Sequence, residues 1–164
     1  MSIALLFPGQ GSQIPGMLDA LPDHPAVTQT LDEVSEYLNT DILELDSEEA
    51  LRSSVSVQLA LLACGVSMAR ALTEEGVVPE AVAGLSVGAF AAAALSGVIS
   101  LSDAVCLVRQ RAAGRIAGPL QAANWLGEMA GRMREGGLSW ARGLSVVSGP
   151  GSPGSRLFAP GQGI

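Results

Sequence analysis

The sequence predicts an α/β fold, in which helices pack around a short parallel sheet. Two short apolar runs, residues 2–7 and 81–86, have the composition of buried strands, and segments with helical patterns alternate with them. Aromatic residues make up only 4% of the 164 residues, whereas Gly and Ala are abundant. This composition favours closely packed helices on a sheet over a β-sandwich, and the length suits one domain with a hydrophobic core.

The first strand is expected at residues 2–7, because a Pro-Gly pair ends the apolar run and the glycines of "PGQGSQ" predict a turn. Apolar residues then recur at helical spacing over residues 27–38, with acidic residues on the opposite face. Residues 47–52 have the pattern of a short, capped helical turn. The single histidine, His24, precedes a proline and is expected in a solvated loop.

The second half of the predicted domain begins with a long helix over residues 55–75. This helix is apolar almost all round, which predicts deep burial, and a glycine follows it as its end. Residues 81–86 are expected to form the second strand and residues 87–95 a helix of small side chains. The motif "SLSD" places an acidic residue three positions after a serine, which predicts the start of a last helix over residues 100–111.

Composition excludes several classes of protein. The net charge of −7, with arginine as the only basic residue, argues against nucleic acid as a partner. One histidine and two distant cysteines give no metal site, and Cys64 and Cys106 are expected to be buried thiols in a reducing compartment. The first ten residues lack the pattern of a signal peptide. The uncharged residues 81–102 are long enough to span a membrane but lack its flanking aromatic and basic residues, so we expect no membrane association and a cytoplasmic location.

The composition changes after Arg111. Residues 112–164 contain 12 of the 20 glycines, both tryptophans, and five arginines against two acidic residues, whereas residues 1–111 contain four arginines against 14 acidic residues. We therefore expect residues 1–111 to form the N-terminal part of the domain. Residues 112–164 are expected to be an atypical Gly-, Arg- and Pro-rich tail with poor order.

One short motif carries most of the chemistry. Gly84-Leu-Ser86-Val-Gly88 lies between a predicted strand and a predicted helix, which is the pattern of a nucleophile elbow. The glycines remove side chains where strand and helix approach closely, and the N-terminus of the helix favours negative charge on a reacting oxygen. The alternative is a tight packing turn without chemistry, because chains rich in Ala, Gly and Ser produce this pattern by chance.

Four stretches also match a known family in their order along the chain: "LLFPGQGSQIPGM" at 5–17, "VSVQLALLACGV" at 55–66, "GLSVGAF" at 84–90 and "LVRQRA" at 107–112. Together they resemble the malonyl-CoA:acyl carrier protein transacylase family. The resemblance reaches residue 112 and covers only the N-terminal third of that family's usual length. It implies a partial α/β-hydrolase-like acyltransferase domain, and the family's ferredoxin-like subdomain is not recognisable here.

The chain departs from the family pattern at several points. Leu85 and Leu59 replace a histidine and a proline, and both changes resemble the malonyltransferase (epsilon) subunit of malonate decarboxylase. The family's general base is a histidine from its C-terminal half, and this chain has no such histidine; His24 lies too early to replace it. One hypothesis is that residues 112–164 are a truncated or out-of-frame reading of a GC-rich gene.

The resemblance also implies roles for particular residues. Ser86 matches the nucleophile, and the backbone N–H groups of Gln10 and Val87 match the oxyanion hole. Arg111 matches the residue that holds the malonyl carboxylate, and Gln58 matches a polar residue of the pocket. The alternatives are that Arg111 is a solvated residue at a helix end and that Gln58 pairs only with local backbone.

The implied function is transfer of a malonyl group from malonyl-CoA or a similar thioester, through a serine ester, to the thiol of an acyl carrier protein. No bound cofactor or metal is implied. Expected partners are an acyl carrier protein and other subunits of malonate decarboxylase. Two alternatives stay open: a truncated, inactive acyltransferase fragment that binds a partner, and a generic serine hydrolase, which Arg111 disfavours.

Overall fold

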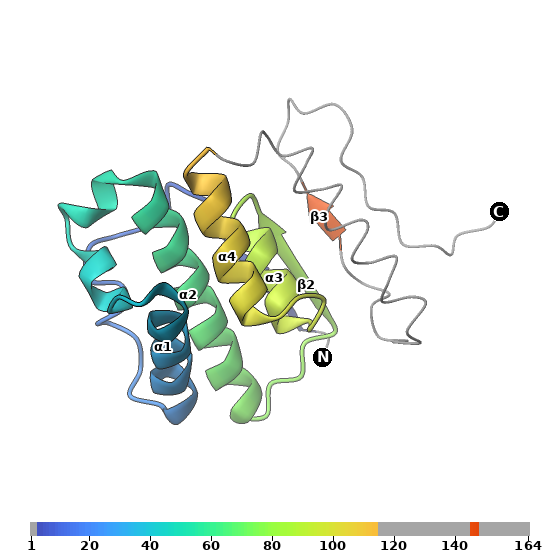
Figure 1. Ribbon diagram of the computed structural model, residues 1–164. Coiled ribbons are helices and arrows are strands. Elements are labelled where there is room, and N and C mark those ends of the chain that lie inside the picture. Colours follow the sequence, from blue (N-terminus) through green and yellow to red (C-terminus); the bar gives the residue numbers. More distant parts are fainter. Residues whose placement is uncertain (1–2, 115–144, 148–164) are drawn as a thin grey trace.

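In the computed structural model, residues 3–114 and 145–147 are described (Figure 1). The strands are β1 (Ala4–Phe7), β2 (Ala81–Leu85) and β3 (Ser145–Val147). The α-helices are α1 (Pro25–Leu38), α2 (Ser54–Glu74), α3 (Gly88–Leu95) and α4 (Leu101–Ala112), and two 3₁₀ helices, η1 (Ile42–Asp46) and η2 (Ala50–Arg52), connect α1 to α2. These elements confirm the predicted α/β class and nearly all of its predicted element positions.

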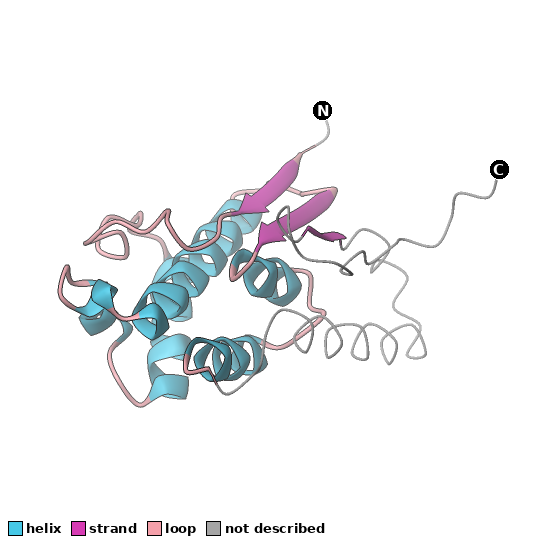
Figure 2. Cartoon of the chain, turned by 90° about the horizontal axis from the view of Figure 1, so that it is seen from above, coloured by secondary structure: helices cyan, strands magenta, loops and turns pink. Residues whose placement is uncertain are grey.

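The strands form one parallel sheet in the order β1-β2-β3. Phe7 at the end of β1 pairs with Gly84 near the end of β2, so the loops that follow the two strands leave the sheet at the same edge (Figure 2). β3 pairs with β2 and falls within the segment predicted as a tail. The other residues of that segment beyond 114 lie outside the described residues, so its expected poor order stays a prediction.

The helices cover one face of the β1–β2 pair (Figure 2). Phe7 faces α2, where a Cβ built on Gly65 would lie only 2.9 Å from the Phe7 ring. On the other face, Leu6 is 76% exposed, and Leu85 is 50% exposed. The expectation of buried strands is therefore only partly met, because the helices in the described part of the chain pack against a single face of the sheet.

Helix α2 is the centre of the core, and α1, α3 and α4 all pack against it. Within the described ranges it is the one helix long and apolar enough to cross a membrane, yet 67% of its most apolar window is buried inside the protein. Its all-round apolar character thus reflects burial among other helices. The uncharged residues 81–102 form no single helix, because they divide into β2, a turn, α3 and the start of α4.

Polar side chains define two of the helix starts. Ser100 caps α4, since its Oγ accepts a hydrogen bond from the Asp103 N–H at 3.0 Å and donates to Asp103 Oδ2 at 2.7 Å, as the sequence predicts. His24 caps α1: its Nδ1 accepts from the Ala26 N–H at 3.1 Å, and its Nε2 lies 3.3 Å from Glu75 Oε1. The expectation of a solvated loop for His24 is wrong, because packing brings the C-terminal end of α2 to this cap.

The two cysteines also differ from their expected burial. Cys64 is half-buried, whereas Cys106 is exposed on α4. Val105 and Val108 on the same helix are three positions apart and fully buried, so they mark the face of α4 that packs on the core. Cys106 lies outside this face. The expectation of buried thiols is therefore wrong for Cys106 and only partly met for Cys64.

Candidate active site

Ser86 occupies the turn between β2 and α3. Its φ of 55° lies in the left-handed region, which costs a residue with a side chain about 1–2 kcal/mol. The carbonyl of Ser86 accepts a hydrogen bond from the Ala89 N–H at 3.1 Å, and that of Val87 accepts from the Phe90 N–H at 3.0 Å. The strand thus turns directly into a helix at Ser86, as the spacing of the glycines predicts.

The two glycines of the motif lie where backbone segments touch. A Cβ built on Gly84 would lie 2.1 Å from the carbonyl carbon and oxygen of Gly88. A Cβ on Gly88 would lie 2.3 Å from the carbonyl oxygen of Phe7 and 2.6 Å from that of Pro8. Neither position has room for a side chain, so these glycines allow α3 to pack on its own strand and on the end of β1.

The loop after β1 reaches the same turn. A Cβ on Gly9 would lie 3.0 Å from the carbonyl oxygen of Leu85 and 3.5 Å from the Cβ of Ser86. The loop is held in shape by two internal hydrogen bonds: the Ser12 hydroxyl donates to the Gly9 carbonyl at 2.8 Å, and the Gly11 N–H donates to Gln13 Oε1 at 2.7 Å. Val87 follows Ser86 directly in the chain, and Gln10 follows Gly9, the residue that touches this turn. The role of their backbone N–H groups as an oxyanion hole stays a prediction.

Arg111 joins the last turn of α4 to this site. Its Nη2 donates a hydrogen bond to Ser86 Oγ at 2.8 Å, and its Nη1 donates to Gln58 Oε1 at 2.9 Å. Its Cζ also lies 5.9 Å from the centroid of the Phe90 ring, within the range of a cation–π contact. Arg111 is therefore no solvated helix-end residue, because its guanidinium contacts three residues on two other helices and the turn.

Gln58 supports Arg111 from inside the protein. Its side chain is only 6% exposed, and its Nε2 donates a hydrogen bond to Ser54 Oγ at 2.9 Å. The alternative, that Gln58 pairs only with local backbone, is wrong, because both hydrogen-bond partners of its amide are side chains. Arg111 thus bridges two residues that are far from it in the sequence, Gln58 and Ser86.

The electrostatics of the site centre on Arg111. Partial burial lowers the pKa of the Arg111 guanidinium, but an arginine side chain starts from so high a pKa that the group stays charged near neutral pH. Among the described residues, Arg70 is the arginine that forms an ion pair with a carboxylate: its Nη1 lies 3.0 Å from Glu33 Oε2. Arg111 therefore presents a cation beside Ser86 Oγ with no described carboxylate to neutralise it, which suits an anionic acyl group.

The single histidine takes no part in this arrangement. Both ring nitrogens of His24 are engaged at the start of α1, by the Ala26 N–H and by Glu75. Over the described residues, then, no imidazole accepts the proton of the Ser86 hydroxyl. This agrees with the inference from the sequence that His24 is not the base.

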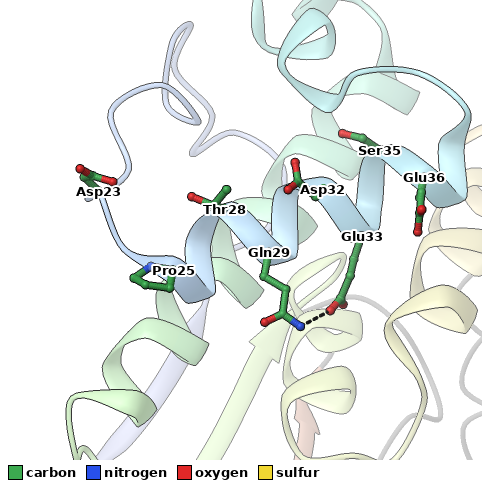
Figure 3. Close-up of a pocket in the computed structure, with 8 residues that line it drawn as sticks. All are labelled: Asp23, Pro25, Thr28, Gln29, Asp32, Glu33, Ser35 and Glu36. Carbon is green, nitrogen blue, oxygen red and sulfur yellow. Dashed lines mark hydrogen bonds between the residues drawn. The ribbon is translucent and has the colours of Figure 1, made fainter.

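A separate hollow of about 850 Å³ lies on the outer face of α1 (Figure 3). Its lining is largely acidic and shares no residue with the Ser86 site: Asp23, Pro25, Thr28, Gln29, Asp32, Glu33, Ser35 and Glu36. Within it, Gln29 Nε2 donates a hydrogen bond to Glu33 Oε1 at 2.9 Å (Figure 3). Its carboxylates would repel the phosphates of an acyl-CoA, so it is unsuited to hold that substrate.

Reasoning from the sequence missed two neighbours of the site, Ser54 and Phe90. Ser54 stands four residues before Gln58, and Phe90 stands four residues after Ser86. Residues four apart on a helix lie on one face, so this spacing was the available signal for Ser54. For Phe90 the signal was weaker, because a phenylalanine in a helix of small residues is also what a core position requires.

Comparison with known proteins places the whole arrangement in a family. The acyl transferase domain family matches residues 4–142, which extends beyond residue 111. The malonyl CoA-acyl carrier protein transacylase of Bacillus subtilis is 40% identical over 114 residues, covering 66% of this chain and 36% of that protein. Its namesake from Escherichia coli K12 is 39% identical over 113 residues, covering 66% and 37%.

Solved structures give the same result. The acyl-carrier-protein S-malonyltransferase of Burkholderia pseudomallei superposes with a TM-score of 0.66 at 38% identity, covering 71% of this chain and 39% of that one. A malonyl-transacylase in complex with a type II polyketide synthase acyl-carrier protein superposes with a TM-score of 0.64 at 36% identity, covering 72% and 40%. The chain spans little more than a third of the length of the curated relatives described above. With its strand–turn–helix at Ser86 and this match over residues 4–142, the chain belongs to the acyl transferase domain family.

Proposed function

We propose that this chain acts as a malonyltransferase, which moves a malonyl group from malonyl-CoA or a similar thioester through Ser86 to the thiol of an acyl carrier protein. The observation that carries this proposal is the position of Arg111. Its guanidinium contacts both the Ser86 hydroxyl at 2.8 Å and the buried Gln58 amide at 2.9 Å, and no described carboxylate neutralises it. Relatives named as malonyl CoA-acyl carrier protein transacylases support the same substrate class.

In the first half of the proposed reaction, Ser86 Oγ attacks the carbonyl carbon of the thioester. The carbonyl oxygen gains negative charge, which the backbone N–H groups of Gln10 and Val87 would stabilise. The new C–O bond forms, the C–S bond breaks, and the proton of the hydroxyl ends on the released thiol. The second half reverses these bonds with the thiol of the carrier protein, and it regenerates the free serine.

Arg111 has two partners in turn in this scheme. Without substrate, its Nη2 donates to Ser86 Oγ. When a malonyl group is present, this donor turns to the malonyl carboxylate, while Nη1 keeps its bond to Gln58. A guanidinium offers two parallel donors to a carboxylate, and an acyl group without a carboxylate leaves them unpaired. Arg111 would therefore select malonyl over acetyl groups.

The proposal also specifies which carrier protein accepts the malonyl group. Leu85 and Leu59 are the two positions that favour the carrier protein of malonate decarboxylase, and the other subunits of that enzyme, over the carrier of fatty-acid synthesis. Leu85 lies directly before Ser86 and is half exposed, so it lies where an incoming carrier would meet the site. Two free cysteines among the described residues support a reducing, cytoplasmic location.

A second candidate function has one specific observation in its favour. His24 is held at the cap of α1, so no described imidazole serves Ser86 as a base. The chain would then be an inactive acyltransferase fragment that binds a partner. A generic serine hydrolase is disfavoured, because esterases have no general use for the cation that Arg111 places on the serine.

Intact mass spectrometry separates these possibilities. The protein is incubated with malonyl-CoA and, in parallel, with acetyl-CoA, and Ser86→Ala is the matched control. We expect a malonyl adduct on the wild type alone and much less acetyl adduct. A folded wild type without any adduct would support the inactive fragment, and equal malonyl and acetyl adducts that hydrolyse in water would support the hydrolase.

A further inference from the structure

We infer that Ser54 is a positioning residue, which fixes the orientation of Arg111 through Gln58 and so sets the preference for acyl groups that carry a carboxylate. This inference rests on the proposed role of Arg111 in malonyl transfer. The contacts run in one line from Ser54 Oγ to Gln58 Nε2 at 2.9 Å, from Gln58 Oε1 to Arg111 Nη1 at 2.9 Å, and from Arg111 Nη2 to Ser86 Oγ at 2.8 Å.

The chemistry of the groups fixes the direction of this line. A guanidinium has only donors, so the Gln58 amide must turn its Oε1 to Arg111. Its NH₂ group then points the opposite way, toward Ser54, whose hydroxyl is able to accept. Gln58 is 6% exposed, and the Ser54 hydroxyl is the acceptor that the structure gives its NH₂ group. Loss of the Ser54 hydroxyl would leave this nearly buried amide donor without its partner, and it would remove one of the two contacts that hold the amide in this orientation.

The position of Ser54 separates this role from a role in folding. Ser54 is the first residue of α2, and the residue that caps this helix is its neighbour, Ser53, which makes no side-chain capping bond. The Ser54 side chain is also exposed, so its removal opens no cavity in the core. A change confined to its hydroxyl should therefore leave the fold intact, at the cost of one lost hydrogen bond, and act on Arg111.

The matched variants are Ser54→Ala, Ser54→Thr and Ser53→Ala. Ser54→Ala removes the acceptor, Ser54→Thr keeps it, and Ser53→Ala removes one hydroxyl from the adjacent residue. In the adduct assay, we expect Ser54→Ala to lower the malonyl-to-acetyl rate ratio about tenfold, because a displaced binding group costs rate only for the substrate that it holds. The rate with acetyl-CoA should stay unchanged, and Ser54→Thr and Ser53→Ala should retain the wild-type ratio.

A second measurement needs no substrate. In ¹⁵N-labelled protein without ligand, hydrogen exchange of the Arg111 guanidinium, identified by its loss in Arg111→Lys, should accelerate several-fold in Ser54→Ala and stay slow in the other two variants. Unchanged exchange in Ser54→Ala, or equal effects of Ser53→Ala, would overturn the inference. If exchange responds as expected while the wild type takes no malonyl group, the positioning by Ser54 stands and the malonyl-transfer function fails.

Discussion

Ser86 keeps an unfavourable backbone conformation because the surrounding backbone leaves no other path. Ser86, with its φ of 55°, is joined to a strand on one side and to a helix on the other. The close contact between Gly84 and Gly88 holds this strand and this helix together. The strain is therefore a property of the turn and remains when the side chain is changed to another non-glycine residue. It places the hydroxyl where Arg111 reaches it.

A pair of substitutions at this position tests the strain directly. Ser86→Gly and Ser86→Ala both remove the hydroxyl and its contact with Arg111, but only glycine adopts a positive φ without steric cost. We expect Ser86→Gly to be more stable than Ser86→Ala by about 1 kcal/mol, measured by urea denaturation. Neither variant should form a malonyl adduct, and equal stabilities would contradict the strained turn.

Helix α4 links a local sequence signal to the site. It begins at the Ser100 cap and carries Arg111 in its last turn, while Val105 and Val108 are buried and the helix packs against α1, α2 and α3. The cap and the buried valines set where the helix starts and which face turns inward. Its last turn then delivers the guanidinium to Ser86 and Gln58, so the geometry of the site depends on the whole element.

The contribution of the cap is measurable with a neighbouring control. Ser100→Ala removes the hydroxyl that accepts the Asp103 N–H, and we expect it to lower the free energy of unfolding by about 1 kcal/mol. Ser102 contacts Ser100 through its hydroxyl but makes no bond to the helix backbone, so Ser102→Ala should stay within about 0.5 kcal/mol of the wild type. Equal losses in thermal or urea unfolding would show that Ser100 does not act as the cap.

At the scale of the whole molecule, the described residues bury their apolar surface among helices on one side of a sheet. The opposite side of the sheet exposes Leu6 and Leu85, and Val78 in the preceding loop is 76% exposed. The outer face of α1, by contrast, is acidic (Figure 3). Stability in the described region therefore comes mainly from the helical core around α2, to which β1 adds the buried Phe7, while the sheet also sets the position of the Ser86 turn.

The dependence of overall stability on pH should report one group inside this core. Burial raises the pKa of the Cys64 thiol above its ordinary value of 9.0, and the nearby Asp46 carboxylate raises it further. As the pH rises past 9.0, the unfolded chain releases this proton while the folded protein retains it, so the free energy of unfolding falls. Below that pH the contribution of Cys64 is constant.

The measurement is urea denaturation at several pH values above and below 9.0. The chain contains no lysine, so few other groups titrate in this window. Cys64→Ala should flatten the decline in stability with rising pH. Cys106→Ala, which changes an exposed thiol, should leave the decline in place; the reverse pattern would show that Cys64 is not the group responsible.

The sequence by itself determined the elements and the turn that holds Ser86. Helical spacing, the Ser100 cap and the two motif glycines are local signals, which act between residues a few positions apart, so they are readable in one dimension. The same is true of the motifs that resemble the transacylase family. Residues 112–164 carried few such signals, and their separation from the rest was inferred from composition and from the point where the family resemblance ends.

The tertiary structure decided which side chains meet. Gln58 and Arg111 lie 53 residues apart, and Arg111 and Ser86 lie 25 apart, so no periodicity predicts their hydrogen bonds. The same holds for the pairing of His24 with Glu75 and for the exposed side of the sheet. The contacts of Arg111 with Gln58 and Ser86 depend on how α2, α4 and the β2–α3 turn pack together, because a displacement of a few ångströms between these elements would break both hydrogen bonds.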